Sequence, residues 1–178
     1  MKKLWTTLST RKIYKNPWIS VREDKVIRPD GEKGIYGVVE FPLGIGVLPI
    51  TADGKVILLK QYRYTLKSDS WEVVNGTVDA GEGRTITARR ELEEEAGLKA
   101  KSLKYMGSFW PSAGITDEVE HLFLATGLSQ VKSKPEGTES FQRKTFTYKK
   151  ALEMIEKGLI KESCTVILLL KAKKFIKG

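Results

Sequence analysis

The chain of 178 residues has one cysteine and one histidine, and these two shortages exclude several kinds of site. A single cysteine, Cys164, cannot form an internal disulfide framework, and it suits a reducing compartment. Because Cys164 lies in an apolar run, we expect it to be buried and unreactive. The histidine, His121, lies in a strand-like stretch beside Leu122 and Phe123, so we expect a packed side chain there rather than a general base.

Long apolar runs are also missing. No stretch approaches the roughly eighteen consecutive apolar residues that a membrane-spanning helix needs. The first residues, MKKLWTTLSTRK, are basic like the start of a signal peptide, but no apolar stretch of the needed length precedes Arg11 and Lys12. We therefore expect no membrane partner and a cytoplasmic location.

Acidic residues are fewer than basic ones, since 22 Asp and Glu face 31 Lys and Arg, for a formal net charge of +9. This excess favours anionic ligands, including nucleotides and RNA, and would steer a diphosphate toward a site. The lysines are dispersed, and no Arg-rich or aromatic-interleaved tract of the kind that reads single-stranded nucleic acid is present. We therefore do not expect nucleic acid as a partner.

No repeat, low-complexity segment or flexible linker divides the chain, and its 40% hydrophobic residues can form one core plus a small appended subdomain. Residues 9–27 alternate apolar and polar positions and then meet a turn signal at Pro29-Asp30-Gly31, and residues 35–41 predict another strand. We assign residues 1–41 to a small antiparallel strand subdomain and residues 42–178 to the main domain.

The main domain is predicted to be a mixed sheet with helices on both faces. The runs Val47–Ile50 and Val56–Leu59, joined by Asp53-Gly54, predict a hairpin. Residues 131–140 are a polar loop. Further strands are expected at residues 70–74, 103–109, 119–125 and 141–146, and helices at residues 85–96, 149–157 and 164–175.

One acidic stretch, residues 76–98 (GTVDAGEGRTITARRELEEEAGL), stands out from this basic chain. Its central part has no Gly or Pro and many good helix formers, and Gly97 supplies the stop expected just past a helix end. On a period of 3.6 residues Glu91, Glu94 and Glu95 fall within an arc of roughly 100°, beside an apolar row. The three carboxylates are therefore expected to share one face of a helix.

Like charges this close are unfavourable unless a cation lies among them. Arg90 can pair with Glu94 or with Glu82, but one arginine cannot neutralise the whole group. Since the ligands are oxygens, with no Cys or His nearby, Mg²⁺ is the natural guest and Mn²⁺ a possible substitute. The alternative is a solvated charged face, and the glycine and glutamate that precede the helix argue against it.

The stretch resembles the signature of the Nudix hydrolases at every specified position. The positions that carry the resemblance are Gly76, Glu82, Arg90-Glu91, Glu94-Glu95 and Gly97, with aliphatic residues at Leu92 and Leu98. The resemblance implies an α/β/α sandwich with a mixed sheet, on which the signature helix packs, preceded here by the small antiparallel subdomain.

Looser similarity points to one branch, the ADP-ribose pyrophosphatases and other nucleoside-diphosphate-sugar hydrolases. The similar segments are Gln61-Tyr62-Arg63-Tyr64, Trp71-Glu72, Pro111-Ser112-Ala113-Gly114 and Thr116-Asp117-Glu118. Pro111 occupies the place of a proline that goes with ADP-ribose or sugar-nucleotide substrates in that branch. Two positions depart from the branch: Val73-Val74-Asn75 replaces its usual Leu-Pro-Ala, and Ala113 replaces a proline.

The resemblance implies roles for the acidic residues. Glu91 and Glu95 would be the main metal ligands, Glu94 would bind a second cation or act through water, and the carbonyl of Asn75 would complete the shell. Glu82 and Arg90 would brace the cluster. The base that activates water would be Glu139, with Glu136 in reserve, and each is alternatively a solvated loop acid.

Substrate contacts are implied in the same way. Arg63 is the candidate for a phosphate contact, unless it pairs with an acid at the rim of the core. Glu118 is the candidate for a contact to the terminal sugar or the metal shell. In the branch, N-terminal strands cross to a second subunit, which implies a homodimer in which Trp18, or less readily Trp5, stacks on the base; packing is the alternative fate. Trp71 and Trp110 flank the expected site or lie in the core.

The resulting prediction is a Mg²⁺-dependent pyrophosphohydrolase that cleaves a nucleoside diphosphate sugar, of the ADP-ribose or GDP-mannose type. One alternative keeps the chemistry but acts on RNA 5′ ends or dinucleoside polyphosphates, and the positive charge is its support. The other is a non-catalytic nucleotide sensor with the same fold, against which the intact glutamates argue.

Overall fold

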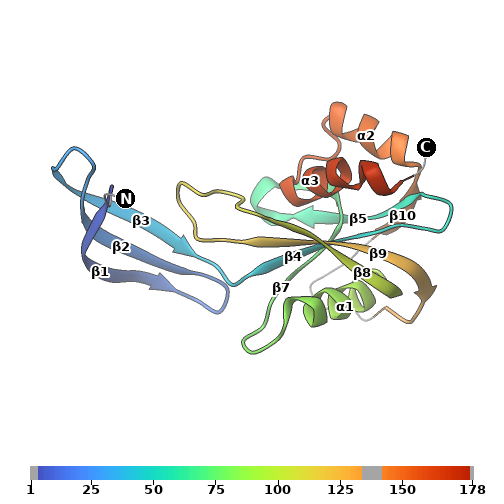
Figure 1. The fold of residues 1–178 in the computed structure, drawn as a ribbon, viewed down its shortest axis with the longest axis horizontal. Coiled ribbons are helices and arrows are strands. Elements are labelled where there is room, and N and C mark those ends of the chain that lie inside the picture. The colour runs from blue at the N-terminus through green and yellow to red at the C-terminus, as the bar shows by residue number, and fades with distance from the viewer. Residues whose placement is uncertain (1–3, 134–141, 177–178) are drawn as a thin grey trace. The chain divides into compact units, whose positions relative to one another are not determined.

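The computed structural model describes residues 4–133 and 142–176 of the chain (Figure 1). The chain divides into two compact units. The first unit comprises residues 1–43 and 110–119, and the second comprises residues 44–109 and 120–178. The described residues contain no helix that is long and apolar enough to cross a membrane.

The first unit is built on a three-stranded antiparallel sheet with the order β1-β2-β3. Its strands are β1 (Thr6–Lys15), β2 (Ser20–Ile27) and β3 (Lys33–Glu40). The turn before β3 contains Gly31 with φ 89°, a conformation that glycine adopts without strain. A small antiparallel sheet was expected in this part of the chain, and the alternating stretch at residues 9–27 forms two of its strands, β1 and β2.

Residues 110–119 join this first unit, whereas the sequence assigned them to the main domain. The N–H of Val39 donates to the carbonyl of Ile115 at 2.9 Å, and the hydroxyl of Tyr36 donates to the carbonyl of Gly114 at 2.7 Å. The N–H of Phe41 donates to the side chain of Asp117 at 3.0 Å. These bonds link β3 to residues more than seventy positions away, so local sequence gives no sign of them.

The second unit contains two sheets. A four-stranded sheet has the order β7-β4-β9-β8, in which β4 and β9 are parallel and the other pairs antiparallel, and an antiparallel sheet has the order β10-β5-β6. The strands are β4 (Gly44–Pro49), β5 (Val56–Arg63), β6 (Ser68–Glu72), β7 (Val74–Thr77), β8 (Leu98–Phe109), β9 (Glu120–Gln130) and β10 (Gln142–Phe146). The helices are α1 (Arg84–Glu94), α2 (Tyr148–Glu156) and α3 (Ser163–Ala172), with short 3₁₀ turns η1 (Tyr64–Leu66) and η2 (Lys173–Phe175).

Two local predictions of strand pairing are wrong. The Asp53-Gly54 turn forms, with Gly54 at φ 77°, but β4 and β5 enter different sheets and share only the bridge between Ile50 and Val56. The single strand expected at residues 70–74 is in fact the end of β6 and the start of β7, again in different sheets. β4 pairs instead with β7 and β9, and β5 pairs with β10 and with β6, the strand that follows it.

Helices cover both faces of the second unit, as predicted. Figure 1 shows α1 on one side of the strands and α2 and α3 on the other. Alternate residues of β4 serve the two faces: Ile45 and Val47 pack in the core under α1, whereas Leu48 packs in the core under α2 and α3 with Leu168. Because both faces are buried, β4 is an unbroken apolar run rather than an alternating one. The architecture is therefore the expected α/β/α arrangement with a mixed sheet.

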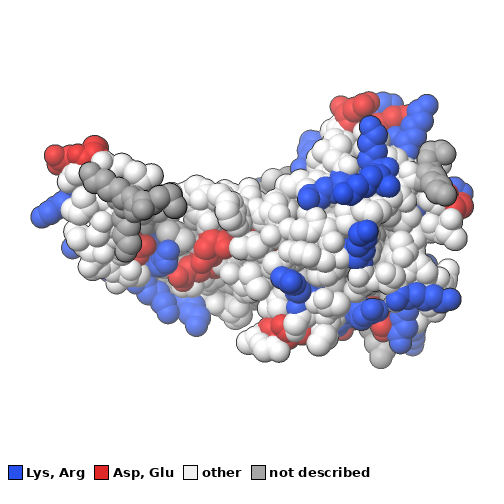
Figure 2. All heavy atoms as spheres, viewed as in Figure 1, with Lys and Arg blue, Asp and Glu red and all other residues white. Residues whose placement is uncertain are grey.

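The surface carries its charge in separate groups. On the face drawn in Figure 2, lysine and arginine side chains form several patches that uncharged surface interrupts. The first unit also exposes large apolar side chains on the strands of its sheet and in the segments beside them. These are Leu4, Trp5, Leu8, Ile13, Tyr14, Trp18 and Ile35, each at least 45% exposed.

Candidate active site on helix α1

Helix α1 presents an apolar row to the sheet and a charged row beside it. Ala88 and Leu92 are buried in the core under the helix, at 0% and 1% exposure. The helix begins at Arg84 and ends at Glu94, within two residues of the predicted bounds. Gly97, at φ 62°, lets the chain turn away, as expected for a residue just past a helix end.

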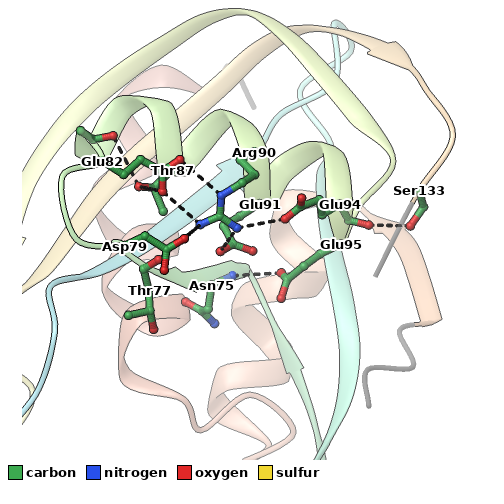
Figure 3. Close-up of polar contacts among 11 residues, drawn as sticks. Asn75, Thr77, Asp79, Glu82, Thr87, Arg90, Glu91, Glu94, Glu95 and Ser133 are labelled. Carbon is green, nitrogen blue, oxygen red and sulfur yellow. Dashed lines mark hydrogen bonds and ion pairs between the residues drawn. The ribbon is translucent and has the colours of Figure 1, made fainter. Parts of the chain in front are cut away.

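Arg90 is the centre of the charged row (Figure 3). Its Nη1 donates to Glu91 Oε1 at 2.9 Å and to Glu94 Oε2 at 3.0 Å. Its Nε and Nη2 contact the two oxygens of Glu82 at 3.3 and 3.1 Å, and Asp79 Oδ2 lies 3.6 Å from Nη2. The pairings of Arg90 with Glu82 and Glu94 that the sequence suggested are therefore both present.

Glu82 is held from a second direction by Thr87, which the sequence reading missed. Thr87 is fully buried, and its hydroxyl donates to Glu82 Oε2 at 2.8 Å. Hydrogen bonds from Arg90, and after it from Thr87, lower the pKa of Glu82 below its usual value. Thr87 precedes Glu91 by four residues and therefore lies on the same face of the helix. This spacing is the sequence feature that could have identified Thr87 as a neighbour of the acidic residues.

Glu95 faces strand β7. Glu95 is 8% exposed, and its Oε2 accepts a hydrogen bond from the backbone N–H of Asn75 at 3.2 Å (Figure 3). Gly76 follows in the strand, and a Cβ atom there would lie 2.3 Å from the carboxyl carbon of Glu91. Only glycine lets the strand approach this carboxylate, so Gly76 is required by close packing.

The donor set fits a hard divalent cation. The single guanidinium of Arg90 contacts four carboxylates, those of Asp79, Glu82, Glu91 and Glu94. Glu95 lies beside them, so negative charges outnumber the positive charge of Arg90. Oxygen donors of this kind suit Mg²⁺ or Mn²⁺. In the described part of the chain, no three His, Cys, Asp or Glu side chains are arranged to hold a metal as they stand. Arg90 contacts one oxygen of Glu91 and one oxygen of Glu94.

Arg63, the candidate for a phosphate contact, pairs with an acid at the core. Its Nε donates to both oxygens of Glu72 at 3.0 and 3.1 Å, and its Nη2 donates to Oε2 as well. This hydrogen-bonded contact is the main cause that raises the pKa of Arg63. The side chain of Arg63 remains 36% exposed, whereas Glu72 is 2% exposed. The alternative considered from the sequence, an ion pair at the core rim, is therefore present.

The remaining candidates belong to the first unit or lie outside the described residues. Pro111 and Glu118 are half-buried residues of the first unit, and Trp18 is 74% exposed in the turn between β1 and β2. Glu136 and Glu139 lie outside the described residues. The structure thus brings together the acidic residues of α1, Glu82 and Asn75, and it assigns no position to the proposed base.

Three residues whose packing was expected or considered from the sequence, His121, Cys164 and Trp71, are indeed packed. His121 is 8% exposed, its Nδ1 lies 3.1 Å from the hydroxyl of Tyr105, and burial lowers its pKa. Burial raises the pKa of the Cys164 thiol well above its usual value. Trp71 packs edge-on against Phe146 with ring centroids 5.0 Å apart.

Long-range contacts around the end of α1 were also missed. The hydroxyl of Ser133 donates to the carbonyl of Glu94 at 2.6 Å (Figure 3), and Arg143 Nη1 donates to the carbonyl of Ala96. Both bonds satisfy carbonyls that a helix end leaves without partners. Because these partners lie 39 and 47 residues away, nothing in the local sequence could have indicated them.

Comparison with known proteins gives consistent matches over most of the chain. The family model described as NUDIX domain matches residues 40–162, and the one described as nucleoside diphosphate sugar hydrolase N-terminal domain matches residues 5–39. A methanol dehydrogenase activator of Bacillus methanolicus is 32% identical over 163 residues, which cover 90% of this chain and 88% of that protein. An ADP-ribose pyrophosphatase of Bacillus subtilis (strain 168) is 34% identical over 152 residues, which cover 84% and 82%.

A solved structure described as an ADP compounds hydrolase shares the fold. Its TM-score is 0.87 at 19% sequence identity, and the match covers 98% of this chain and 96% of that one. At this identity the likeness concerns the fold alone.

Proposed function

This chain belongs to the Nudix hydrolase family, and we propose that it is a Mg²⁺-dependent pyrophosphohydrolase that cleaves the diphosphate of a nucleoside diphosphate sugar. The observation that carries the proposal is the crowd of carboxylates around Arg90 on one edge of α1. Carboxylates this close repel one another, and a bound cation would offset that repulsion.

The residues that would hold the cation are Glu91, Glu94 and Glu95, with the carbonyl of Asn75. A bound Mg²⁺ or Mn²⁺ would supply neutralising charge for the phosphate oxygens and a bound water of lowered pKa. Arg90 would keep the carboxylates of Glu91 and Glu94 in place, because it already contacts both of them.

The protein's own groups supply the rest of the reaction. Arg63 would contact a phosphate of the substrate, since its partly exposed guanidinium suits a phosphate oxygen. We assign the proton transfer to Glu139, or to Glu136 in its place: the carboxylate takes the proton of the attacking water. A new P–O bond forms to that water, and the bond from the attacked phosphorus to the bridging oxygen breaks. One water is consumed, and a nucleoside monophosphate and a sugar phosphate leave.

ADP-ribose is the substrate that the relatives support best, because an ADP-ribose pyrophosphatase matches most of this chain. The products would be AMP and ribose 5-phosphate. GDP-mannose is the alternative within the same class. The single buried Cys164 suits a reducing compartment, and the cytoplasm is the location we propose.

A homodimer is part of the proposal. The exposed apolar side chains of the first unit are of the kind that marks a protein contact. Trp18, at 74% exposure, is the residue we assign to stacking on the nucleobase. A mass measured by light scattering tests the dimer, and a Trp18→Ala variant with a raised KM for the nucleotide sugar tests the stacking.

One substrate panel tests the function. ADP-ribose, GDP-mannose, a dinucleoside polyphosphate and 5′-triphosphorylated RNA are each incubated with the protein and Mg²⁺, and the products are identified by mass spectrometry. We expect the nucleotide sugars to be hydrolysed fastest. Faster turnover of the RNA or the dinucleoside polyphosphate would replace the proposed substrate, and the net charge of +9 is the observation that favours them. No turnover of any compound would indicate a nucleotide sensor.

The same assay tests the base. Glu139→Gln should lower kcat by about two to four orders of magnitude, the usual contribution of general acid–base catalysis, with little change in KM. Glu136→Gln is the matched control on the same stretch. If only Glu136→Gln lowers kcat, the role belongs to Glu136.

A further inference from the structure

A buried carboxylate, Glu72, lies where the chain passes from one sheet of the second unit to the other. It is the last residue of β6, which pairs with β5, and Val74 is the first residue of β7, which pairs with β4. Only 2% of Glu72 is exposed. A buried charge is costly unless it is paired and hydrogen-bonded, so the partners of Glu72 explain its place.

Its first partner is Arg63 at the end of β5. Glu72 engages Nε and Nη2 on one edge of the guanidinium. Because a guanidinium is planar and presents its donors in a fixed fork, holding one edge sets the direction of the others. Glu72 also lies 3.4 Å from Nδ2 of Asn75, whose backbone N–H donates to Glu95, so these contacts connect Arg63 to the acidic cluster. The arginine therefore belongs to the same region as the acidic cluster.

Its second partner is Asn75 on β7. The side-chain Nδ2 of Asn75 lies 3.4 Å from Glu72 Oε2 and 3.3 Å from the carbonyl of Val73. The backbone N–H of the same residue donates to Glu95 Oε2 at 3.2 Å. Asn75 thus contacts Glu72 through its side chain and Glu95 through its main chain.

The junction that carries these residues is fixed from the other face. The N–H of Val73 donates to the hydroxyl of Thr165 at 2.9 Å, in place of a strand partner. Thr165 is fully buried in α3, and its hydroxyl donates to Glu162 Oε2 at 2.7 Å. Glu162 also accepts from the backbone N–H groups of Cys164 and Thr165 at the start of α3. Because the backbone at Val73 is held in this way, a change in the side chain of Glu72 should shift its neighbour Asn75 rather than be absorbed by the junction.

We propose that Glu72 is a positioning residue shared by both halves of the site: it aims Arg63 at the substrate phosphate and, through Asn75, holds the N–H group that fixes Glu95. The proposal rests on the function proposed above. It differs from a purely structural ion pair in its consequences, because a structural pair would affect the free energy of unfolding and leave substrate and metal binding unchanged.

Three variants test the proposal: Glu72→Gln, Arg63→Lys and the double variant. For each, KM and kcat for ADP-ribose are measured, the affinity of the substrate-free protein for Mn²⁺ is measured by calorimetry, and thermal unfolding is recorded. Glu93→Gln is the matched control, because Glu93 lies on α1 and pairs only loosely with Lys99, at 3.7 Å.

Glu72→Gln should change two properties at once. We expect KM to rise about tenfold and the affinity for Mn²⁺ to fall about tenfold, within the range found for residues that orient the ligands of a metal. Arg63→Lys should raise KM and leave Mn²⁺ affinity unchanged. The double variant should have the KM of Arg63→Lys, because Glu72 acts on the substrate through Arg63.

Two results would overturn the proposal: KM and Mn²⁺ affinity in Glu72→Gln that match those of Glu93→Gln, or KM effects that multiply in the double variant. If Glu72→Gln does not fold, Asn75→Ala replaces it and should lower Mn²⁺ affinity, whereas unchanged affinity would refute the link to Glu95. A wild-type protein without turnover of nucleotide sugars would refute the proposed function, and the Mn²⁺ measurements would still decide the role of Glu72.

Discussion

Helices α1 and α3 lie on opposite faces of the second unit and differ in composition: α3 is mostly apolar, whereas α1 is mostly charged. Helix α3 buries Leu168, Leu169 and Ala172 completely in its core, and its sequence SCTVILLLKA contains a single charge. Helix α1 buries only Ala88, Leu92 and Thr87, and charged residues occupy most of its other positions. A narrow apolar row is enough to hold α1 against the sheet, which leaves a full edge of the helix for acidic side chains.

The comparison indicates that stability and chemistry are separated between the two faces. Substitutions on the edge of α1 should remove activity and leave the protein folded. Substitutions of the buried apolar residues of α3, such as Leu168, should lower the stability of the fold without changing the turnover of the molecules that remain folded. The four predictions below test this separation, beginning with the largest effect.

Glu95→Gln should abolish most turnover. Removing one carboxylate ligand takes away part of the charge stabilisation in the transition state, several kcal/mol, and kcat should fall on the order of a thousandfold. The free energy of unfolding should change little, because the loss of one charge relieves repulsion in the acidic cluster. Steady-state kinetics and urea unfolding measure the two effects, and equal turnover in this variant would refute the metal assignment.

Leu168→Ala should lower the stability of the protein and leave the turnover of the folded molecules unchanged. Leu168 is fully buried, so truncation should lower the free energy of unfolding by about 2–5 kcal/mol through lost burial and a cavity. Leu170→Ala is the control in the same helix, because Leu170 is 59% exposed and its loss should cost less than about 0.5 kcal/mol. Activity per folded molecule should match the wild type in both. A fall in kcat for folded Leu168→Ala would show that the two faces are coupled.

Arg90→Gln should have an intermediate effect on turnover. Glu91 and Glu94 would lose the guanidinium that holds them, and kcat/KM should fall by about 10- to 100-fold, as for residues that orient metal ligands. Arg89→Gln is the matched control, since Arg89 on the same helix donates to the carbonyl of Ala100 and not to the cluster. Equal losses in the two variants would show that the effect is one of helix stability.

Thr87→Val should produce the smallest effect, and it should depend on pH. The pKa of Glu82 is lowered by Arg90 and Thr87, so the carboxylate stabilises the fold at pH values above its unfolded pKa. That contribution is lost as the pH falls through the lowered pKa of the folded state. The variant should therefore be less stable than the wild type at pH 7, and the difference should shrink in acid. Urea unfolding between pH 7 and pH 3 measures this, and a pH-independent difference would assign the loss to packing.

The sequence was sufficient for features that depend on neighbouring residues. The approximate bounds of α1 and the contact between Arg90 and Glu94 follow from helix-forming sequence and periodicity, which need only a few residues on either side, and Gly97 lies just past the helix end as expected. The contact between Arg90 and Glu82, across the loop before α1, was the other pairing that the sequence offered. The two apolar faces of the main domain follow from the same local patterns. These predictions are confirmed by the structure.

Pairing between distant strands could not be predicted. The predicted Asp53-Gly54 turn is present, but the strands on its two sides belong to different sheets. β4 pairs with β7 and β9, and β5 pairs with β6 and β10. The attachment of residues 110–119 to the first unit depends on bonds across more than seventy residues. For the same reason the sequence could not name Glu72 as the acid that pairs with Arg63.

The most direct test of the acidic edge of α1 is a titration of the substrate-free protein with Mn²⁺, followed by electron paramagnetic resonance. We predict that the wild type and Glu93→Gln bind Mn²⁺ with the same affinity, and that Glu95→Gln binds it at least about tenfold more weakly. Equal binding by the wild type and Glu95→Gln, or none by the wild type, would contradict the account.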